Sequence, residues 1–140
     1  MTLPAGLLDT CVVIELGGQA IDESQIPDEQ VITAITIGEL SVGPLVAADA
    51  DERSRRQLRL QAIETQFSVA TLPYDAAAAR VFGRVMAAAL LRGRSSRARI
   101  SDYQIAAIAI AHDLPLYTIN VKNFAGIKDL AVMPVMMLNT

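Results

Sequence analysis

Short apolar segments alternate with longer segments of mixed polarity along the chain, which is the pattern of strands joined by helices. The segment 31–35, VITAI, is rich in β-branched residues and is typical of a strand. Pro134 interrupts the last apolar segment and therefore restricts it to a sheet edge or a bulge. We predict strands at 6–9, 31–35, 67–72, 116–119 and 131–138.

The longer segments between these strands predict helices. Thr36 offers an N-cap for the second helix, in which Pro44 marks a kink or a break. The segment 101–113 is apolar almost all round, so its helix should be buried against the sheet. Helices are predicted at 10–16, 36–48, 50–66, 74–92 and 101–113. Strands and helices that alternate at this spacing indicate a single three-layer α/β/α domain, residues 1–140, with a mainly parallel central sheet.

The composition agrees with such a packed core. Of the 140 residues, 52% are hydrophobic and only 4% are aromatic, which favours a core of Ala, Val, Leu and Ile. The single cysteine, Cys11, excludes an intramolecular disulfide and a cysteine-based zinc site. No apolar run reaches the roughly 20 residues that span a bilayer, and the first ten residues lack the basic and apolar regions of a signal peptide. We therefore expect a cytoplasmic protein without a membrane anchor.

The net charge of −3 and the pI of about 5.0 argue against a protein that binds nucleic acid through bulk positive charge. They do not exclude an enzyme that holds phosphates through a metal ion and a local basic patch. Ten arginines fall between Arg53 and Arg99. Such a charge run is most often a solvated helix face, but the cluster at 92–99 immediately precedes Asp102 and is a candidate phosphate-facing loop.

Four polar residues are expected at one edge of the sheet. Asp9 ends the first strand, and Glu39 follows the second. The helix that begins near Asp102 runs into the fourth strand, which Asn120 ends. All four positions therefore lie at the carboxyl edge of a parallel sheet, where open α/β sheets bind their ligands. Carboxylates that meet in one crevice repel one another unless a cation compensates, and hard oxygen ligands suit Mg²⁺ or Mn²⁺.

Two of the three acids also have a simpler structural explanation. Asp9 could cap the helix that follows it, and Glu39 could complete a capping box with Thr36. Asp102 is the most informative acid, because a separate capping box at 101–104 leaves its carboxylate unneeded for capping. Three independent caps need not share one edge. The set therefore favours a site in which acids hold one or two divalent ions and orient the water that cuts a phosphodiester bond.

Two threonines flank this site. Thr10 and Thr118 could hydrogen-bond a carboxylate or a phosphate of the substrate, and ordinary strand-end threonines are an equally good explanation. His112, the only histidine, lies at the far end of its helix and is assigned a structural role.

Five motifs carry a resemblance to a known family: LLDTCVVIEL, ITAITIGELSVG, LPYDAAAARVFG, ISDYQIAAIAIAHDLPLYTIN and VKNFAGI. In this order and at this spacing they resemble the PIN-domain ribonucleases, and within them the VapC-like toxins of bacterial toxin–antitoxin pairs. The resemblance covers nearly the whole chain. Each motif alone is weak, but the ordered set is specific.

The resemblance implies a PIN-like fold and an endoribonuclease that depends on Mg²⁺, or on Mn²⁺ in its place. It implies catalytic roles for Asp9, Glu39, Asp102 and Asn120, with Asp9 and Asp102 holding the metal ion. It also implies inhibition by a VapB-like antitoxin encoded beside the toxin, and a homodimer. The chain departs from many relatives at Asn123, where they carry Asp or another potential ligand, so the number of metal ions stays open.

Two other function classes stay open as well. A PIN-like module with a weak site could bind RNA or protein without cleaving RNA, and Asn123 is its main support. A phosphoacceptor receiver domain also carries acids at this edge, but it needs paired acids after its first strand, and Asp9 has no acidic neighbour. A dehydrogenase is disfavoured because no G-x-G-x-x-G motif follows a strand.

Overall fold

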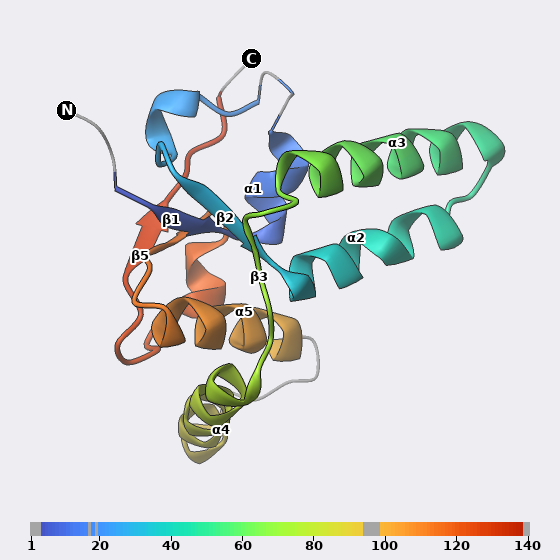
Figure 1. Cartoon of the computed structure of the whole chain (residues 1–140). Coiled ribbons are helices and arrows are strands. Elements are labelled where there is room, and N and C mark those ends of the chain that lie inside the picture. The colour runs from blue at the N-terminus through green and yellow to red at the C-terminus, as the bar shows by residue number, and fades with distance from the viewer. Residues whose placement is uncertain (1–3, 17, 19, 94–98, 139–140) are drawn as a thin grey trace.

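The computed structural model describes residues 4–16, 18, 20–93 and 99–138. At its centre lies a sheet whose strands run in the order β3-β2-β1-β4-β5, and every neighbouring pair in this order is parallel (Figure 1). The predicted α/β class with a parallel central sheet is therefore confirmed. The strands are β1 Gly6–Leu8, β2 Gln30–Thr33, β3 Thr71–Leu72, β4 Leu116–Thr118 and β5 Val132–Pro134.

Helices connect these strands, and four of them begin at a side-chain cap. Side-chain oxygens of Asp9, Thr33, Asp49 and Asp75 each accept a backbone N–H of the helix that follows. Among the described residues, no helix is both long and apolar enough to cross a bilayer. The helices are α1 Thr10–Glu15, α2 Ala34–Leu45, α3 Ala50–Gln66, α4 Ala76–Leu91 and α5 Ile100–Ala111, with short 3₁₀ turns at η1 Glu23–Gln25 and η3 Val121–Phe124.

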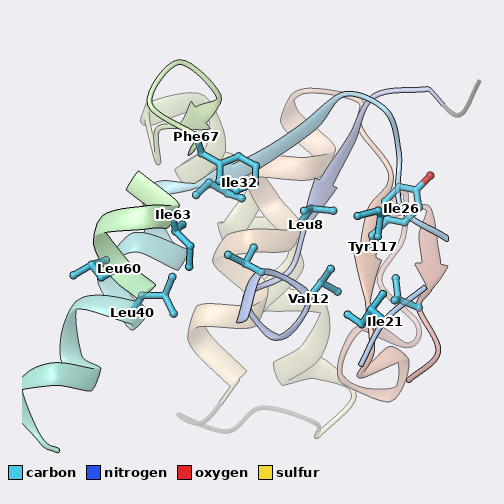
Figure 2. Close-up of a cluster of buried hydrophobic side chains, with 12 residues drawn as sticks. Leu8, Val12, Ile21, Ile26, Ile32, Leu40, Leu60, Ile63, Phe67 and Tyr117 are labelled. Carbon is cyan, nitrogen blue, oxygen red and sulfur yellow. The ribbon is translucent and has the colours of Figure 1, made fainter. Parts of the chain in front are cut away.

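Consecutive residues of β1 point to opposite faces of the sheet and belong to two different cores. Leu8 packs with α1, α2 and α3, in the cluster that Figure 2 shows with Val12 and Ile63. Leu7 packs on the other face with α4 and α5, where Ile105 is one of its partners. All of these side chains are buried. A helical layer thus covers each face, as the three-layer prediction requires, and α5 is buried as predicted.

The central strand of the sheet is β1, with β4 as one of its neighbours, and from these two strands the chain proceeds to opposite sides. β1 is followed by β2 and β3 on one side, and β4 is followed by β5 on the other. The carboxyl ends of β1 and β4 therefore form the point at which the strand order reverses. Doubly wound sheets place their ligand crevice at such a point. Asp9 follows β1 directly, and Asn120 lies just beyond β4.

The third predicted strand, 67–72, is wrong in its first part. Only Thr71–Leu72 pairs with β2, because Phe67 ends α3 and its carbonyl accepts the Ala70 N–H in a turn. Phe67 is buried, whereas Val69 is 99% exposed. Apolar residues in a turn therefore imitated the pattern of a strand.

Two predicted helix starts are also wrong. α2 begins earlier than predicted and is capped by Thr33, whose Oγ1 accepts the Thr36 N–H at 3.1 Å. Pro44 lies inside α2, one residue before its end, and so does not break it. At the described start of α5, which begins at Ile100, no side chain caps the helix, and the predicted capping box at 101–104 does not form.

Candidate active site at the carboxyl edge of the sheet

Asp9 is buried between β1 and β4, with 5% of its surface exposed. Its Oδ1 accepts the Thr10 N–H at 2.9 Å, which makes Asp9 the N-cap of α1. Its Oδ2 accepts the hydroxyl of Thr118 at 2.8 Å and the thiol of Cys11 at 3.2 Å. Capping is therefore a correct explanation of Asp9, but it uses only one carboxylate oxygen. The other oxygen, Oδ2, is oriented by Thr118 of β4, which lies across the point where the strand order reverses.

The donors to Asp9 are themselves fixed. Thr118 is fully buried, and its Oγ1 also accepts the Asn120 N–H at 3.0 Å. Burial raises the pKa of the Cys11 thiol, and the charge of Asp9 raises it further, so the thiol keeps the proton that it donates. Of the two roles considered for Thr118, hydrogen bonding to a carboxylate is the one observed, and its burial leaves no surface for a substrate.

Glu39 lies in the second turn of α2 and bonds to the first residue of α1. The Thr10 hydroxyl donates to Glu39 Oε1 at 2.7 Å. Because that proton is committed to Glu39, the 2.8 Å hydrogen bond between Thr10 Oγ1 and Thr36 Oγ1 must be donated by Thr36. The predicted capping box of Thr36 and Glu39 is wrong, since both residues lie inside the helix. Glu39 is instead held at the site by a threonine from another element.

Asp102 lies in the first turn of α5, with its side chain 20% exposed. The Arg99 guanidinium lies 3.5 Å from its Oδ2, and the side-chain amide of Asn123 lies close enough to lower its pKa. Asn123 is thus a partner of Asp102, at a position where the sequence suggested a missing metal ligand. The i,i+3 spacing of Arg99 and Asp102 is a signal in the sequence from which this ion pair could have been predicted. No local signal indicates the contact with Asn123.

The three acids share one electrostatic field. Partial desolvation raises the pKa of Glu39, which is still exposed on one side, and the charges of Asp9 and Asp102 add to the rise, against the hydrogen bond from Thr10. Burial also raises the pKa of Asp102, followed by the charge of Asp9, while Arg99 and Asn123 lower it. Within the described ranges, Arg99 is the one cation at ion-pair distance from any of the three acids. Most of the negative charge at this edge is therefore uncompensated.

The donor atoms suit a hard divalent cation, because carboxylate oxygens are the ligands that Mg²⁺ prefers in proteins. However, no three His, Cys, Asp or Glu side chains of the described residues are arranged so that they could hold a metal ion together. The described residues therefore do not form the predicted joint cation pocket of Asp9, Glu39 and Asp102, although the three acids share one edge of the sheet and influence one another's pKa. Asn120 is exposed beside them, and its side chain forms no hydrogen bond with the described part of the chain.

Known proteins resemble this chain in both sequence and structure. No family model matches the chain. It is similar to Ribonuclease VapC5 of Mycobacterium tuberculosis, with 42% identity over 118 residues that cover 84% of each protein. It is also similar to Ribonuclease VapC8 of the same organism, with 35% identity over 106 residues, 74% of this chain and 89% of that protein. The crystal structure of VapBC-5, a member of the VapBC family of toxin–antitoxin systems from M. tuberculosis, superposes with a TM-score of 0.78 and 35% identity, over 94% of this chain and 98% of that chain.

Proposed function

The chain belongs to the VapC ribonuclease family and has its PIN-like fold, and from this membership we propose that it is an endoribonuclease, the toxin of a toxin–antitoxin pair. The observation that carries the proposal is the placement of Asp9, Glu39 and Asp102 within one electrostatic field at the carboxyl edge of the sheet. A water molecule activated at this edge would attack an RNA phosphodiester. The proposed products are two shorter RNA chains.

We further propose that the site works with Mg²⁺, or with Mn²⁺ in its place, held by Asp9 and Asp102. The support is the chemistry of the donors: the charge of Asp9 raises the pKa of Asp102, which is the repulsion that a cation relieves. Such an ion would neutralise charge on the scissile phosphate and lower the pKa of the attacking water. Asn123 is a neutral amide close to Asp102 and adds no charge, which favours one ion over two.

The chain's own residues orient this chemistry. Thr118 and Cys11 fix the direction of Asp9 Oδ2. Glu39 has its Oε1 bonded to Thr10, whereas its Oε2 has no hydrogen-bond partner among the described residues. We assign to Oε2 the role of accepting a proton from the attacking water. We assign to the exposed amide of Asn120 a hydrogen bond to a phosphate oxygen of the RNA.

An antitoxin is the proposed protein partner. The structurally similar VapBC-5 is a toxin–antitoxin system, and by analogy this chain would bind a VapB-like antitoxin. We also propose a homodimer, which only the family resemblance of the sequence implies. The acidic edge gives an electrostatic reason for this chain to bind an antitoxin. A basic side chain of the antitoxin placed there would offset the repulsion among Asp9, Glu39 and Asp102 and would exclude the substrate.

A second candidate function is a catalytically weak PIN-like module that binds RNA or protein. It is favoured by one observation, that no three acids of the described residues are arranged as joint metal ligands. The two candidates differ in turnover. Only the nuclease releases new RNA ends, and only the nuclease loses its activity with a chelator.

A cleavage assay with purified protein and end-labelled RNA tests the proposal. We expect cutting with Mg²⁺ or Mn²⁺, and none with EDTA or with Asp9→Asn. Asn is also a good N-cap, so this variant keeps α1. Asp51→Asn removes an exposed acid at the start of α3 and should cut like the wild type. Activity that persists in EDTA contradicts the proposal, and a wild type that binds RNA without cutting it favours the weak module.

A further inference from the structure

A basic cavity adjoins the acidic site on the side of Asp102. Its volume is about 260 Å³, and it lies between the end of α4, the start of α5, and η3 with the turn that follows. Its cations are Arg92, Arg99 and Lys122, and Asn123 also lines it. Of the described residues that line the cavity, none is acidic. An anion is therefore the ligand that fits its charge.

Two of the three cations keep their charge uncompensated. In the part of the chain that the structure describes, neither Arg92 nor Lys122 has an acidic partner at ion-pair distance. The Arg92 Nη1 donates to the Gly126 carbonyl at 2.9 Å, which holds the guanidinium in place without neutralising it. Lys122 is exposed on η3. In a chain with a net charge of −3, such a local group of cations attracts anions that the rest of the surface repels.

Arg99 and Asn123 connect this cavity to the acidic site, because both line the cavity, Arg99 lies 3.5 Å from Asp102 Oδ2, and both side chains lower the pKa of Asp102. An anion in the cavity would therefore lie beside the site at which the phosphodiester is cut. A phosphate-binding cavity beside a cleavage site suits a chain of regularly spaced phosphates. A phosphodiester strand can occupy both sites at once.

We propose that the cavity is a subsite for the RNA phosphate next to the scissile one, bound by Arg92, Arg99 and Lys122. The inference rests on the proposed function, since it places a second part of the same substrate. Guanidinium groups bind phosphate oxygens through paired N–H donors, and the lysine adds a point charge. Val85, Ala89 and Ile127 form apolar parts of the wall, and such a wall strengthens the attraction because it lowers the local dielectric constant.

An acidic protein segment is the competing occupant of the cavity. Its carboxylates would bind the same cations, but the segment would gain nothing from the acids on the other side of Arg99. An RNA strand uses both sides, with one phosphate in the cavity and the next at the acids and their proposed cation. RNA is therefore the occupant that the arrangement favours.

The first experiment measures RNA binding without cleavage. A short, fluorescent, single-stranded RNA of mixed sequence is titrated with the Asp9→Asn protein in Mg²⁺, at several salt concentrations. Adding Lys122→Ala should weaken binding roughly three- to tenfold and should reduce the slope of log K against log salt by about 0.7. Lys122→Glu should weaken binding further, and Arg92→Gln should act in the same direction. Circular dichroism and the melting temperature establish that each variant is folded.

A matched control comes from α3. Arg53 is exposed there and has no acidic partner among the described residues, so Arg53→Ala makes the same change of charge away from the cavity. We expect it to leave both the affinity and the salt slope unchanged.

The second experiment locates the phosphate. An RNA with one neutral methylphosphonate next to its cleavage site should be cut more slowly than the normal RNA by the wild type. In the Arg92→Gln/Lys122→Ala double variant the difference in rate between the two RNAs should be much smaller, because only Arg99 of the three cations remains to bind the phosphate charge.

Three results overturn the inference or its basis in distinct ways. Equal RNA binding by the Lys122→Ala, Arg92→Gln and Arg53→Ala proteins rejects the subsite. Unchanged RNA binding with weakened binding of the VapB-like antitoxin rejects it too, and assigns the cavity to an acidic protein segment. A wild type that binds RNA with the expected dependence on these cations but cuts none rejects the nuclease function, while the cavity still stands as an RNA-binding site.

Discussion

Thr118 Oγ1 donates a 2.8 Å hydrogen bond to Asp9 Oδ2, and through this bond β4 orients the carboxylate that follows β1. The same hydroxyl accepts the Asn120 N–H at 3.0 Å, so one buried threonine joins the acid to the exit of β4. A buried carboxylate oxygen is costly to leave without a donor. The two central strands and the direction of Asp9 are therefore stabilised by the same group.

Thr118→Val should remove this hydrogen bond without changing the packing of the side chain, because valine keeps the branched shape and lacks the hydroxyl. We expect the free energy of unfolding to fall by about 1–3 kcal/mol, since Asp9 Oδ2 and the Asn120 N–H each lose a partner. The single-turnover cleavage rate should fall more than the RNA affinity. Urea unfolding and rapid-quench assays measure the two effects. Thr118→Ser keeps the hydroxyl and should cut faster than Thr118→Val; equal rates would contradict an orienting role for this bond.

The hydroxyl of Thr10 should set the acidic limb of the pH–rate profile. Its hydrogen bond lowers the pKa of Glu39 against the rise that burial causes. In Thr10→Val that hydrogen bond is lost, so the pKa of Glu39 should rise further. Protonated Glu39 cannot accept a proton from water, and the acidic limb of kcat/KM should therefore move to higher pH. Thr10→Ser should leave the limb in place, and a limb that stays fixed in Thr10→Val would rule out Glu39 as the base.

The carboxyl-edge position of the acids was predictable from the direction of the chain. Asp9 had to follow the first strand, and the helix that carries Asp102 had to return to the edge from which the fourth strand exits. These inferences need only the order of strands and helices and the rule that parallel sheets use one edge for ligands. Small errors at the ends of helices left them intact.

The contacts that orient the acids were not predictable, because they join distant parts of the sequence. Thr10 and Glu39 are 29 positions apart, and Asp9 and Thr118 are 109 positions apart. The local pattern also placed the cap of α2 at Thr36, whereas the structure places it at Thr33. The end of β2 at Thr33 decides the position of the cap, and that end depends on pairing with β1 and β3. Strand pairing is a tertiary property that a local pattern does not contain.

Without metal, the carboxylate of Asp102 should destabilise the folded protein. Its pKa is raised in the folded state by burial and by the charge of Asp9, so its ionisation favours the unfolded chain at every pH above that raised pKa. Asp102→Asn in EDTA should therefore raise the urea midpoint at neutral pH. The gain should shrink as the pH falls through the folded-state pKa of Asp102, because the wild-type carboxyl then becomes neutral as well.

The control for this prediction is Asp51→Asn, which removes an exposed acid from the first turn of α3. It should not raise the urea midpoint at neutral pH. A midpoint that falls in Asp102→Asn would show that the ion pair with Arg99 outweighs the repulsion, contrary to the direction of the pKa shift.

The glycine at position 38 should lower the free energy of unfolding while it allows full RNA cleavage. It lies inside α2, exposed, one residue before Glu39, and a methyl group added there would meet nothing within 4 Å. Gly38→Ala should raise the free energy of unfolding by about 0.5–1 kcal/mol, because alanine is the better helix former. We expect its cleavage rate to fall, since the methyl group occupies space through which RNA approaches the backbone beside Glu39.

Gly83→Ala is the matched control, because Gly83 is exposed inside α4 with equally open surroundings. It should gain the same stability and cut at the wild-type rate. The test measures the free energy of unfolding and the cleavage rate of both variants. Full cleavage activity in Gly38→Ala would mean that the substrate does not approach the backbone at this position.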